Sequence, residues 1–187
     1  MVYRYQNYIY LAHTGISREV FLVKEWRSDD TEINGIEAEA AYKMDLHTLG
    51  KWEVGSYYDL VRNISTADSS IRKWSDGDYM PNMPTSRFGF NLSGTVQKLN
   101  FNIALDHYMK QKYLGKNINP ELPMPAFSLL NARVSYEDTH LKMGSIEYYI
   151  AGSNLLNTEA RLQNSQLKFL SPLAGINISV GVKIKIS

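Results

Sequence analysis

The stretch Ile176-Asn177-Ile178-Ser179-Val180-Gly181-Val182-Lys183-Ile184-Lys185-Ile186 alternates strictly between two kinds of residue. Every even position carries a β-branched apolar side chain, and every odd position is glycine or carries a polar or cationic side chain. Such alternation predicts a β-strand with one apolar face. The length of the stretch matches the roughly 9 to 11 residues that a tilted strand needs to cross a bilayer. The sequence therefore predicts a membrane-spanning strand at this end of the chain.

The same period-two pattern occurs along the rest of the chain. Most of the polar faces carry charged or amide side chains, which a dry core tolerates only with partners, so these faces indicate a wet or plugged interior. We expect eight strands, in the segments 2–12, 20–44, 52–60, 87–93, 99–106, 128–136, 146–150 and 176–186. Together they predict an all-β fold, an antiparallel transmembrane β-barrel.

The segment 20–44 has two interpretations. It is either two strands with a turn at Ser28-Asp29-Asp30, or one long strand that continues beyond the membrane. The apolar residues on both sides of this tripeptide keep the same even phase, from Leu22 to Met44. A two-residue hairpin would also favour glycine or Asn-Gly at the turn. The phase therefore favours one long strand.

Composition restricts the class of protein without naming a partner. The 187 residues contain 20 Lys and Arg against 19 Asp and Glu, so no surface for nucleic acid is favoured. The lack of Cys excludes a disulfide scaffold and thiolate metal sites. A mean hydropathy of -0.31, with no apolar run near the roughly 18 residues of a spanning helix, excludes a helical membrane protein.

The last six connections between the expected strands alternate between short and long. Turns are expected around 45–50, at Gln97 and around 138–143, and longer loops at 64–85, 111–125 and 154–173. Outer-membrane barrels have short periplasmic turns and longer extracellular loops. The alternation therefore predicts that the long loops lie outside the cell and that the C-terminus lies in the periplasm.

Five short motifs follow one another along the chain, the first within the long strand 20–44 and the others near the starts or ends of strands. They are Gly35-Ile36-Glu37-Ala38-Glu39, Met83-Pro84-Thr85-Ser86-Arg87, Phe127-Ser128-Leu129-Leu130-Asn131-Ala132-Arg133, Ala151-Gly152-Ser153-Asn154-Leu155-Leu156-Asn157-Thr158-Glu159-Ala160-Arg161 and Ser171-Pro172-Leu173-Ala174-Gly175. In this order and spacing, the motifs cover nearly the whole chain. The sequence resembles the C-terminal part of the β-barrel of TonB-dependent outer-membrane receptors.

The resemblance implies active import of a scarce ligand across the outer membrane, with energy supplied through TonB. The ligand classes are a metal, a metal chelate or siderophore, and haem. The segment 162–172 looks most like the branch that includes zinc, siderophore and haem receptors. The implied partners are outer-membrane lipid, a plug, the remaining barrel strands and the TonB complex, with no cofactor and no nucleic acid.

The sequence departs from the family pattern in three ways. Family barrels have about 22 strands around a plug, so we expect residues 1–187 to form a partial C-terminal β-barrel domain without the plug. The first residues, Met1-Val2-Tyr3-Arg4-Tyr5, show no secretory signal. The last residues, Ile186-Ser187, lack the aromatic residue with which such barrels usually end. We therefore expect a C-terminal fragment of an outer-membrane receptor.

Several polar residues at lumen-facing positions are candidates for contact with the plug or the ligand. They are Arg87, Asn91, Asp106, Tyr108, Asn131 and Arg133. The alternative is that they form the interior polar network that any plugged barrel needs. Glu37 and Glu39 face the same interior, and we expect them to pair with Arg or Lys across strands or with the plug, which is a structural role in both cases.

Aromatic residues make up 12% of the chain and are expected at the membrane interface, where amphipathic rings are favoured. They include Tyr3, Tyr5, Tyr8, Tyr10, Trp52, Tyr57, Tyr58, Tyr148 and Tyr149. A platform for stacking nucleic-acid bases would need interleaved basic residues, which these strands lack.

No metal site is expected from the histidines or the loop acids. His47 and His140 fall in periplasmic turns, His13 near the outer rim, and His107 at a lipid-facing position. These four residues do not converge. Three loop acids, Asp68, Asp76 and Asp78, indicate a solvated loop rather than a cation site.

The sequence contains no motif for catalysis. A Gly-x-Ser-x-Gly elbow, a phosphate loop and His-Glu-x-x-His are all absent, so we expect no enzyme. An autonomous eight-stranded outer-membrane barrel with a structural or enzymatic role is the alternative to a receptor fragment. A soluble β-sandwich that binds a partner is a third interpretation.

Overall fold

The computed structural model of the chain describes residues 2–19, 21–66, 78–115, 121–139 and 144–186. Within these residues, no helix is long and apolar enough to cross a membrane. The elements in chain order are β1 (Val2–Arg18), β2 (Phe21–Asp45), the 3-10 turn η1 (His47–Leu49), β3 (Lys51–Ser65), β4 (Arg87–Val96), β5 (Leu99–Tyr108), β6 (Phe127–Asp138), β7 (Gly144–Ser153) and β8 (Asn177–Ile186).

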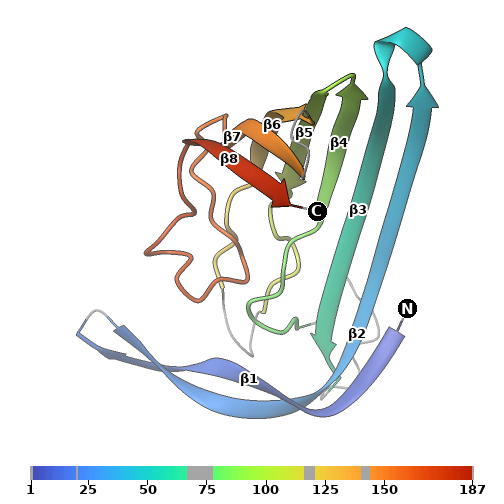
Figure 1. Ribbon diagram of the computed structural model, residues 1–187. Coiled ribbons are helices and arrows are strands. Elements are labelled where there is room, and N and C mark those ends of the chain that lie inside the picture. The colour runs from blue at the N-terminus through green and yellow to red at the C-terminus, as the bar shows by residue number, and fades with distance from the viewer. Residues whose placement is uncertain (1, 20, 67–77, 116–120, 140–143, 187) are drawn as a thin grey trace.

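The strands form one antiparallel sheet in chain order, β1-β2-β3-β4-β5-β6-β7-β8. The sheet curves from β2 and β3 round to β7 and β8 (Figure 1). Within the part of the chain that the structure describes, β1 and β8 do not pair, so the sheet is open. The predicted all-β antiparallel fold with eight strands is therefore confirmed, as an unclosed segment of barrel wall.

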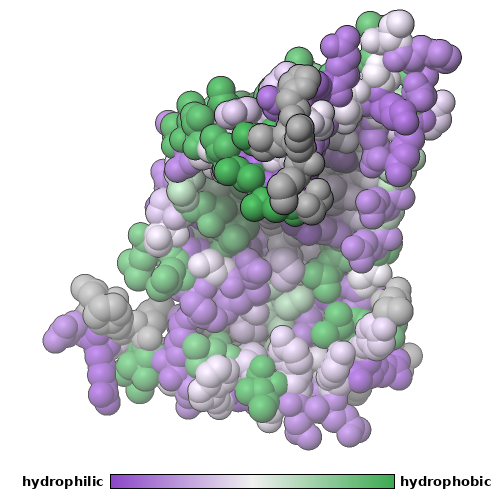
Figure 2. Space-filling view, viewed as in Figure 1, coloured by the Kyte–Doolittle hydropathy of each residue, from purple (hydrophilic) through white to green (hydrophobic). Residues whose placement is uncertain are grey.

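Side-chain alternation gives the sheet two different faces. The even-numbered apolar residues of β8 pair with even residues of β7, as in Val180 with Ile150 and Ile184 with Ile146. Val180 is 76% exposed although it lies in the middle of a strand. Figure 2 shows hydrophobic surface gathered over the region of β7 and β8. In this family of folds, such a convex apolar face is the one that contacts lipid, so we call it the outer face and the opposite one the inner face.

Two predicted strand boundaries can be compared with the structure. The first strand was expected to end near Ala12, but β1 continues to Arg18 because its register with β2 resumes after a bulge, at Ser17 with Leu22. The second strand is continuous from Phe21 to Asp45, without a turn at Ser28-Asp29-Asp30. The common phase of its apolar residues correctly predicted one strand.

Short and long connections lie at opposite ends of the sheet. Two residues join β4 to β5, and η1 lies between β2 and β3. The long connections 66–86, 109–126 and 154–176 all leave from the other end, where the β1–β2 hairpin also bends across (Figure 1). The predicted alternation of loop length is confirmed, and the described parts of the long loops form a layer over one end of the wall, which we call the loop layer.

The buried apolar residues lie in or next to the loop layer rather than in the middle of the wall. Met80 has no exposed surface, and it packs with Tyr10 and Ala12 of β1. The other buried apolar residues are Ile64, Tyr79, Met124, Phe127 and Ala160, all in these loops or at the strand ends beside them. A sheet with lipid on one face and a wet lumen on the other has no core of its own, so the loops supply the packed region.

Several tyrosines do not lie at the lipid interface as expected. Tyr10 is buried against Met80, with Tyr8 beside it. A bulge between Tyr5 and Tyr8 reverses the phase of β1, so that Tyr3 and Tyr10 pair with odd residues of β2 and both lie on the inner face. Strict alternation cannot foresee such a reversal. The rings of Trp52, Tyr58 and Tyr148 do lie on the outer face, as predicted.

Candidate functional site

The inner face carries ion pairs and hydrogen bonds between neighbouring strands. Asp59 of β3 is directly opposite Arg87 of β4, and Arg87 is opposite Tyr108 of β5. Since odd residues of β3 and β4 and even residues of β5 share this face, polar groups from three strands meet in one row. The row contains two of the six candidate residues, Arg87 and Tyr108, and a third, Asp106, lies two residues before Tyr108 on the same face, opposite Gly89.

Arg87 is the centre of the first cluster. Its Nε donates to Asp59 Oδ2 at 2.7 Å, and its Nη1 lies 3.5 Å from the Tyr108 hydroxyl. The guanidinium carbon lies 5.3 Å from the centre of the Tyr57 ring. The Tyr57 hydroxyl in turn donates to Asp106 Oδ1 at 2.5 Å. Tyr57 was expected at the lipid interface, but its odd position turns it inward.

Arg133 is the centre of a second cluster, on β6 and β7. Its Nη2 donates to Glu147 Oε1 at 2.9 Å, and its guanidinium carbon lies 3.9 Å from the centre of the Tyr149 ring. Tyr149 was also expected at the interface, and it too faces inward. The two clusters repeat one arrangement, in which an arginine stacks on a tyrosine and pairs with a carboxylate.

A glycine lies under each of these two tyrosine rings. Tyr57 is directly opposite Gly89, and Tyr149 is directly opposite Gly181. A Cβ atom added to Gly89 would lie 2.3 Å from Cε1 of Tyr57, and one added to Gly181 would lie 2.4 Å from the Tyr149 hydroxyl oxygen. Only glycine allows the rings to lie this close to the neighbouring strand, and the arginines then stack on them.

The two candidate asparagines contact the protein itself. Asn131 Oδ1 accepts a hydrogen bond from the backbone N–H of Asn154 at 3.1 Å, where β7 gives way to its long loop. Asn91 fills the space over Gly55, since a Cβ there would lie 2.1 Å from Asn91 Oδ1. Both side chains therefore shape the wall, and their contact with plug or ligand stays a prediction.

Glu37 and Glu39 lie on the inner face of β2, opposite Asp59 and Tyr57 respectively. Both are exposed, and within the described part of the chain neither takes part in an ion pair. Arg87, the cation opposite Asp59 on the same face, is already paired with Asp59. The two carboxylates are thus available to a cationic group from outside the described wall.

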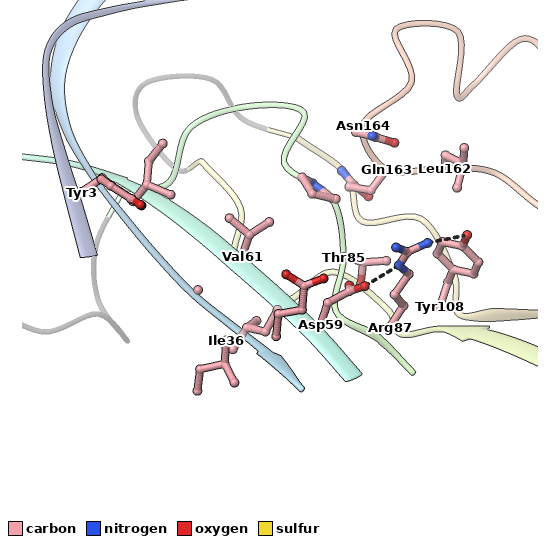
Figure 3. A pocket seen from close by; sticks show the side chains of 15 residues that line it. Tyr3, Ile36, Asp59, Val61, Thr85, Arg87, Tyr108, Leu162, Gln163 and Asn164 are labelled. Carbon is pink, nitrogen blue, oxygen red and sulfur yellow. Dashed lines mark hydrogen bonds and ion pairs between the residues drawn. The ribbon is translucent and has the colours of Figure 1, made fainter. Parts of the chain in front are cut away.

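A cavity of about 960 Å³ lies between this part of the inner face and the loop layer (Figure 3). Asp59, Arg87 and Tyr108 line it from the wall, and Tyr3 lines it from β1. Its other end is formed by two loop segments, Pro84–Thr85 and Leu162-Gln163-Asn164. The first cluster therefore faces a space large enough for a small molecule or for another protein segment.

His47 and His107 lie apart from the two clusters. The ring of His107 on the outer face contacts the Ser128 hydroxyl at 2.9 Å, and His47 lies in η1. Among the described residues, no group of three or more His, Cys, Asp or Glu residues is arranged to hold a metal ion. His140, Asp68 and Asp76 lie outside the described residues.

Comparison with known proteins agrees with this architecture. The solved structure of a protein named "Copper transporter OprC" superposes with a TM-score of 0.75 at 13% identity, over 97% of this chain and 28% of that chain. At this identity the likeness shows the fold, and the chain spans about a quarter of the length of that relative. No curated protein sequence matches. Residues 2–155 match the family model described as "TonB dependent receptor-like, beta-barrel". The family model matches most of the chain, and the antiparallel wall and its polar inner face agree with it. The chain therefore belongs to the family of TonB-dependent receptor-like β-barrels.

Proposed function

We propose that the chain is the C-terminal part of the barrel of a receptor that imports a scarce ligand across the outer membrane with energy from TonB. The family consists of outer-membrane barrels for TonB-dependent transport, which supports the general activity. The observation that carries the proposal is the contrast between the two faces. The outer face is apolar and exposed, whereas the inner face carries two arginine clusters, the first of which lines a cavity of about 960 Å³.

The cavity and the first cluster are the part of the wall that we assign to ligand or plug. Arg87 keeps its planar guanidinium at the cavity because Asp59 and Tyr57 hold it there. Glu37, also at the cavity, adds a carboxylate without an ion-pair partner in the described wall. These groups suit a partner that presents both a cationic and an anionic or hydroxyl group.

We assign Glu37 and Glu39 to cationic side chains of a plug inside the lumen. The assignment is supported by their inward position and by the absence of ion pairs to them within the described strands. Replacing both by Gln should loosen the plug and raise the conductance of the purified protein in a planar bilayer. Glu53→Gln is the matched control, because Glu53 faces inward but already pairs with Lys43 at 3.5 Å. Equal conductance of the double variant and the unmodified protein would refute the assignment.

The orientation follows from the loops. We place the loop layer at the cell surface and the C-terminus in the periplasm, since long loops are extracellular in bacterial barrels. An autonomous eight-stranded barrel is disfavoured because β1 and β8 do not pair within the described residues. A closed barrel would leave no such edges.

Uptake by intact cells tests the proposed function directly. Cells with and without the protein, and with and without TonB, would be supplied in turn with labelled zinc, copper, a ferric siderophore and haem. We expect accumulation of one of these ligands to require both the protein and TonB. Accumulation that needs the protein but not TonB would contradict the proposal, and so would uptake of none of these ligand classes.

A further inference from the structure

Lys168 is buried in the loop layer, although lysine is among the residues least often buried. It belongs to the long loop between β7 and β8, and its side chain is only 5% exposed. A lysine ammonium has three N–H donors, and burial is tolerated only when they are matched by acceptors. Its neighbours Leu167 and Phe169 both point outward, so the burial of Lys168 is specific to this residue.

The three donors of Lys168 are matched by acceptors from three different loops. Lys168 Nζ donates to Glu121 Oε1 at 2.6 Å in the β5–β6 loop, and to Asn82 Oδ1 at 3.1 Å in the β3–β4 loop. The third acceptor is the backbone oxygen of Gln163 at 2.9 Å, in its own loop. One ammonium group therefore joins segments that are 47 and 86 residues apart from it in the sequence.

Further hydrogen bonds join the same three loops around this ion pair. The second carboxylate oxygen of Glu121 accepts from the backbone N–H of Asn82 at 3.0 Å. The side-chain oxygen of Gln163 accepts from the backbone N–H of Met124 at 2.8 Å. We call Lys168, Glu121, Asn82 and Gln163 the Lys168 cluster. Because each loop is bonded to both others through it, the three loops are constrained as one body.

The Lys168 cluster also adjoins the cavity. Gln163 lies in the lining segment Leu162-Gln163-Asn164 and is bonded to Lys168 directly. Asn82, another loop partner of Lys168, lies two residues before the lining segment Pro84–Thr85. Figure 3 shows Leu162, Gln163 and Asn164 on the side of the cavity opposite Ile36. The Lys168 ammonium therefore connects the two sides of this end of the cavity, together with the hydrogen bonds around it.

We propose that the Lys168 cluster holds the described loop segments 78–86, 121–126 and 154–176 closed over the cavity, and that access to the cavity from the loop side requires the Lys168–Glu121 ion pair to open. A buried ion pair is well suited to this because it has two discrete states. It is stable only when fully bonded, and removal of one partner leaves an unpaired buried charge that drives the loops apart. The proposal rests on the loops alone, and it holds for whichever ligand the protein binds.

Limited trypsin digestion of the protein, purified from the membranes of the cells that express it, tests the proposal. In the unmodified protein we expect Lys168 to resist cleavage, because it is buried and its backbone oxygen accepts from Arg161 at 2.7 Å. Glu121→Ala keeps the lysine and removes its partner, so cleavage after Lys168 should be about tenfold faster, in line with a larger open population. Glu137→Ala, which removes the Lys185 partner in the wall, is the matched control and should leave that rate unchanged.

The pattern of cleavage decides the outcome. Faster cleavage after Lys168, with Arg133 in the wall still protected, supports the proposal. An unchanged rate after Lys168 in Glu121→Ala overturns it. Cleavage at Arg133 in the same variant would also overturn it, because the ion pair would then hold the wall rather than the loops.

A distance measurement provides a second test that does not depend on a protease. The chain contains no Cys, so spin labels can be placed at Leu122 and Leu170, which are 69% and 75% exposed on two of the joined loops. Lys168→Met should broaden the distribution of distances between the labels, whereas Lys110→Met, at an exposed lysine, should not. A distribution in Lys168→Met as narrow as that of the unmodified protein would overturn the proposal. Neither the trypsin digestion nor the distance measurement depends on transport. Failure of the uptake assay would therefore contradict the proposed function without contradicting the role of the Lys168 cluster.

Discussion

The ring of Tyr57 lies against Gly89 of the neighbouring strand, with its hydroxyl 2.5 Å from Asp106 Oδ1. This contact places the ring flat on the inner face and leaves room for the Arg87 guanidinium above it. Arg133 of β6, Tyr149 of β7 and Gly181 of β8 repeat the relationship. The wall therefore presents ordered arginines without filling the lumen.

Gly89→Ala should destabilise the protein through Tyr57. The added Cβ would lie 2.3 Å from the ring, so the ring must move and its hydrogen bond to Asp106 is lost. We expect the free energy of unfolding to fall by about 1 to 3 kcal/mol, the usual cost of overpacking. Urea titration of the detergent-solubilised protein measures it. In a Tyr57→Ala background the same substitution should cost much less, and an equal cost in both backgrounds would exclude the ring as the cause.

The Arg133→Lys variant should be less stable than the unmodified protein. Lysine keeps the charge, but it lacks the planar group that stacks on Tyr149 while donating to Glu147. Since Arg133 is 40% exposed in the open wall, we expect a loss of about 1 kcal/mol or less, with Arg133→Met losing no more than about twice that. The thermal unfolding midpoint measures both variants. A lysine variant as stable as the unmodified protein would show that the stacking contributes nothing.

Asn154→Ala should free the start of the β7–β8 loop. The Asn154 side chain donates to the backbone oxygens of Thr158 and Ala174 and accepts from the Thr158 N–H, and its φ of 48° lies in the left-handed region. Loss of these bonds at a buried position should cost about 1 to 3 kcal/mol. Hydrogen exchange of the Thr158 and Leu173 amides would report the loosening. Asn154→Gly removes the backbone strain but does not restore the lost hydrogen bonds. The Thr158 and Leu173 amides should therefore exchange nearly as fast in this variant as in Asn154→Ala.

Val180→Arg should prevent stable insertion into lipid, whereas Ser179→Arg should be tolerated. The two residues are adjacent in β8 but lie on opposite faces, and only Val180 lies on the outer face. An arginine facing lipid at mid-depth costs about 2 to 4 kcal/mol. The fraction of protein recovered in lipid vesicles after refolding measures the difference. Equal recovery of the two variants would contradict the assignment of the faces.

The alternation of side chains was sufficient to predict most of the fold. It gave the eight strands and the single long strand Phe21–Asp45, because a phase shared over many residues is set by the pleat and not by distant contacts. It failed at the start of β1, where the bulge between Tyr5 and Tyr8 reverses the phase. A bulge is decided by the partner strand, which the local sequence does not show.

The candidate site could be predicted only in part. Arg87 and Arg133 follow from their odd positions, but their partners Asp59 and Glu147 were missed. Asp59 lies on the same face by the same alternation, so closer use of the phase could have found it. The contacts within the Lys168 cluster could not be foreseen, because they join loops whose separation depends on the curvature of the whole wall.

The most direct test of the account is a cysteine scan along β8. The chain has no Cys of its own, so single cysteines at Ser179, Val180, Val182 and Lys183 can be labelled in outer membranes from cells that express the protein. We predict that a water-soluble maleimide labels the odd positions, and that a fluorophore at the even positions is quenched by a quencher confined to lipid. Equal labelling of odd and even positions, with no quenching from lipid, would contradict a barrel wall with a polar inner face and a lipid-facing outer face.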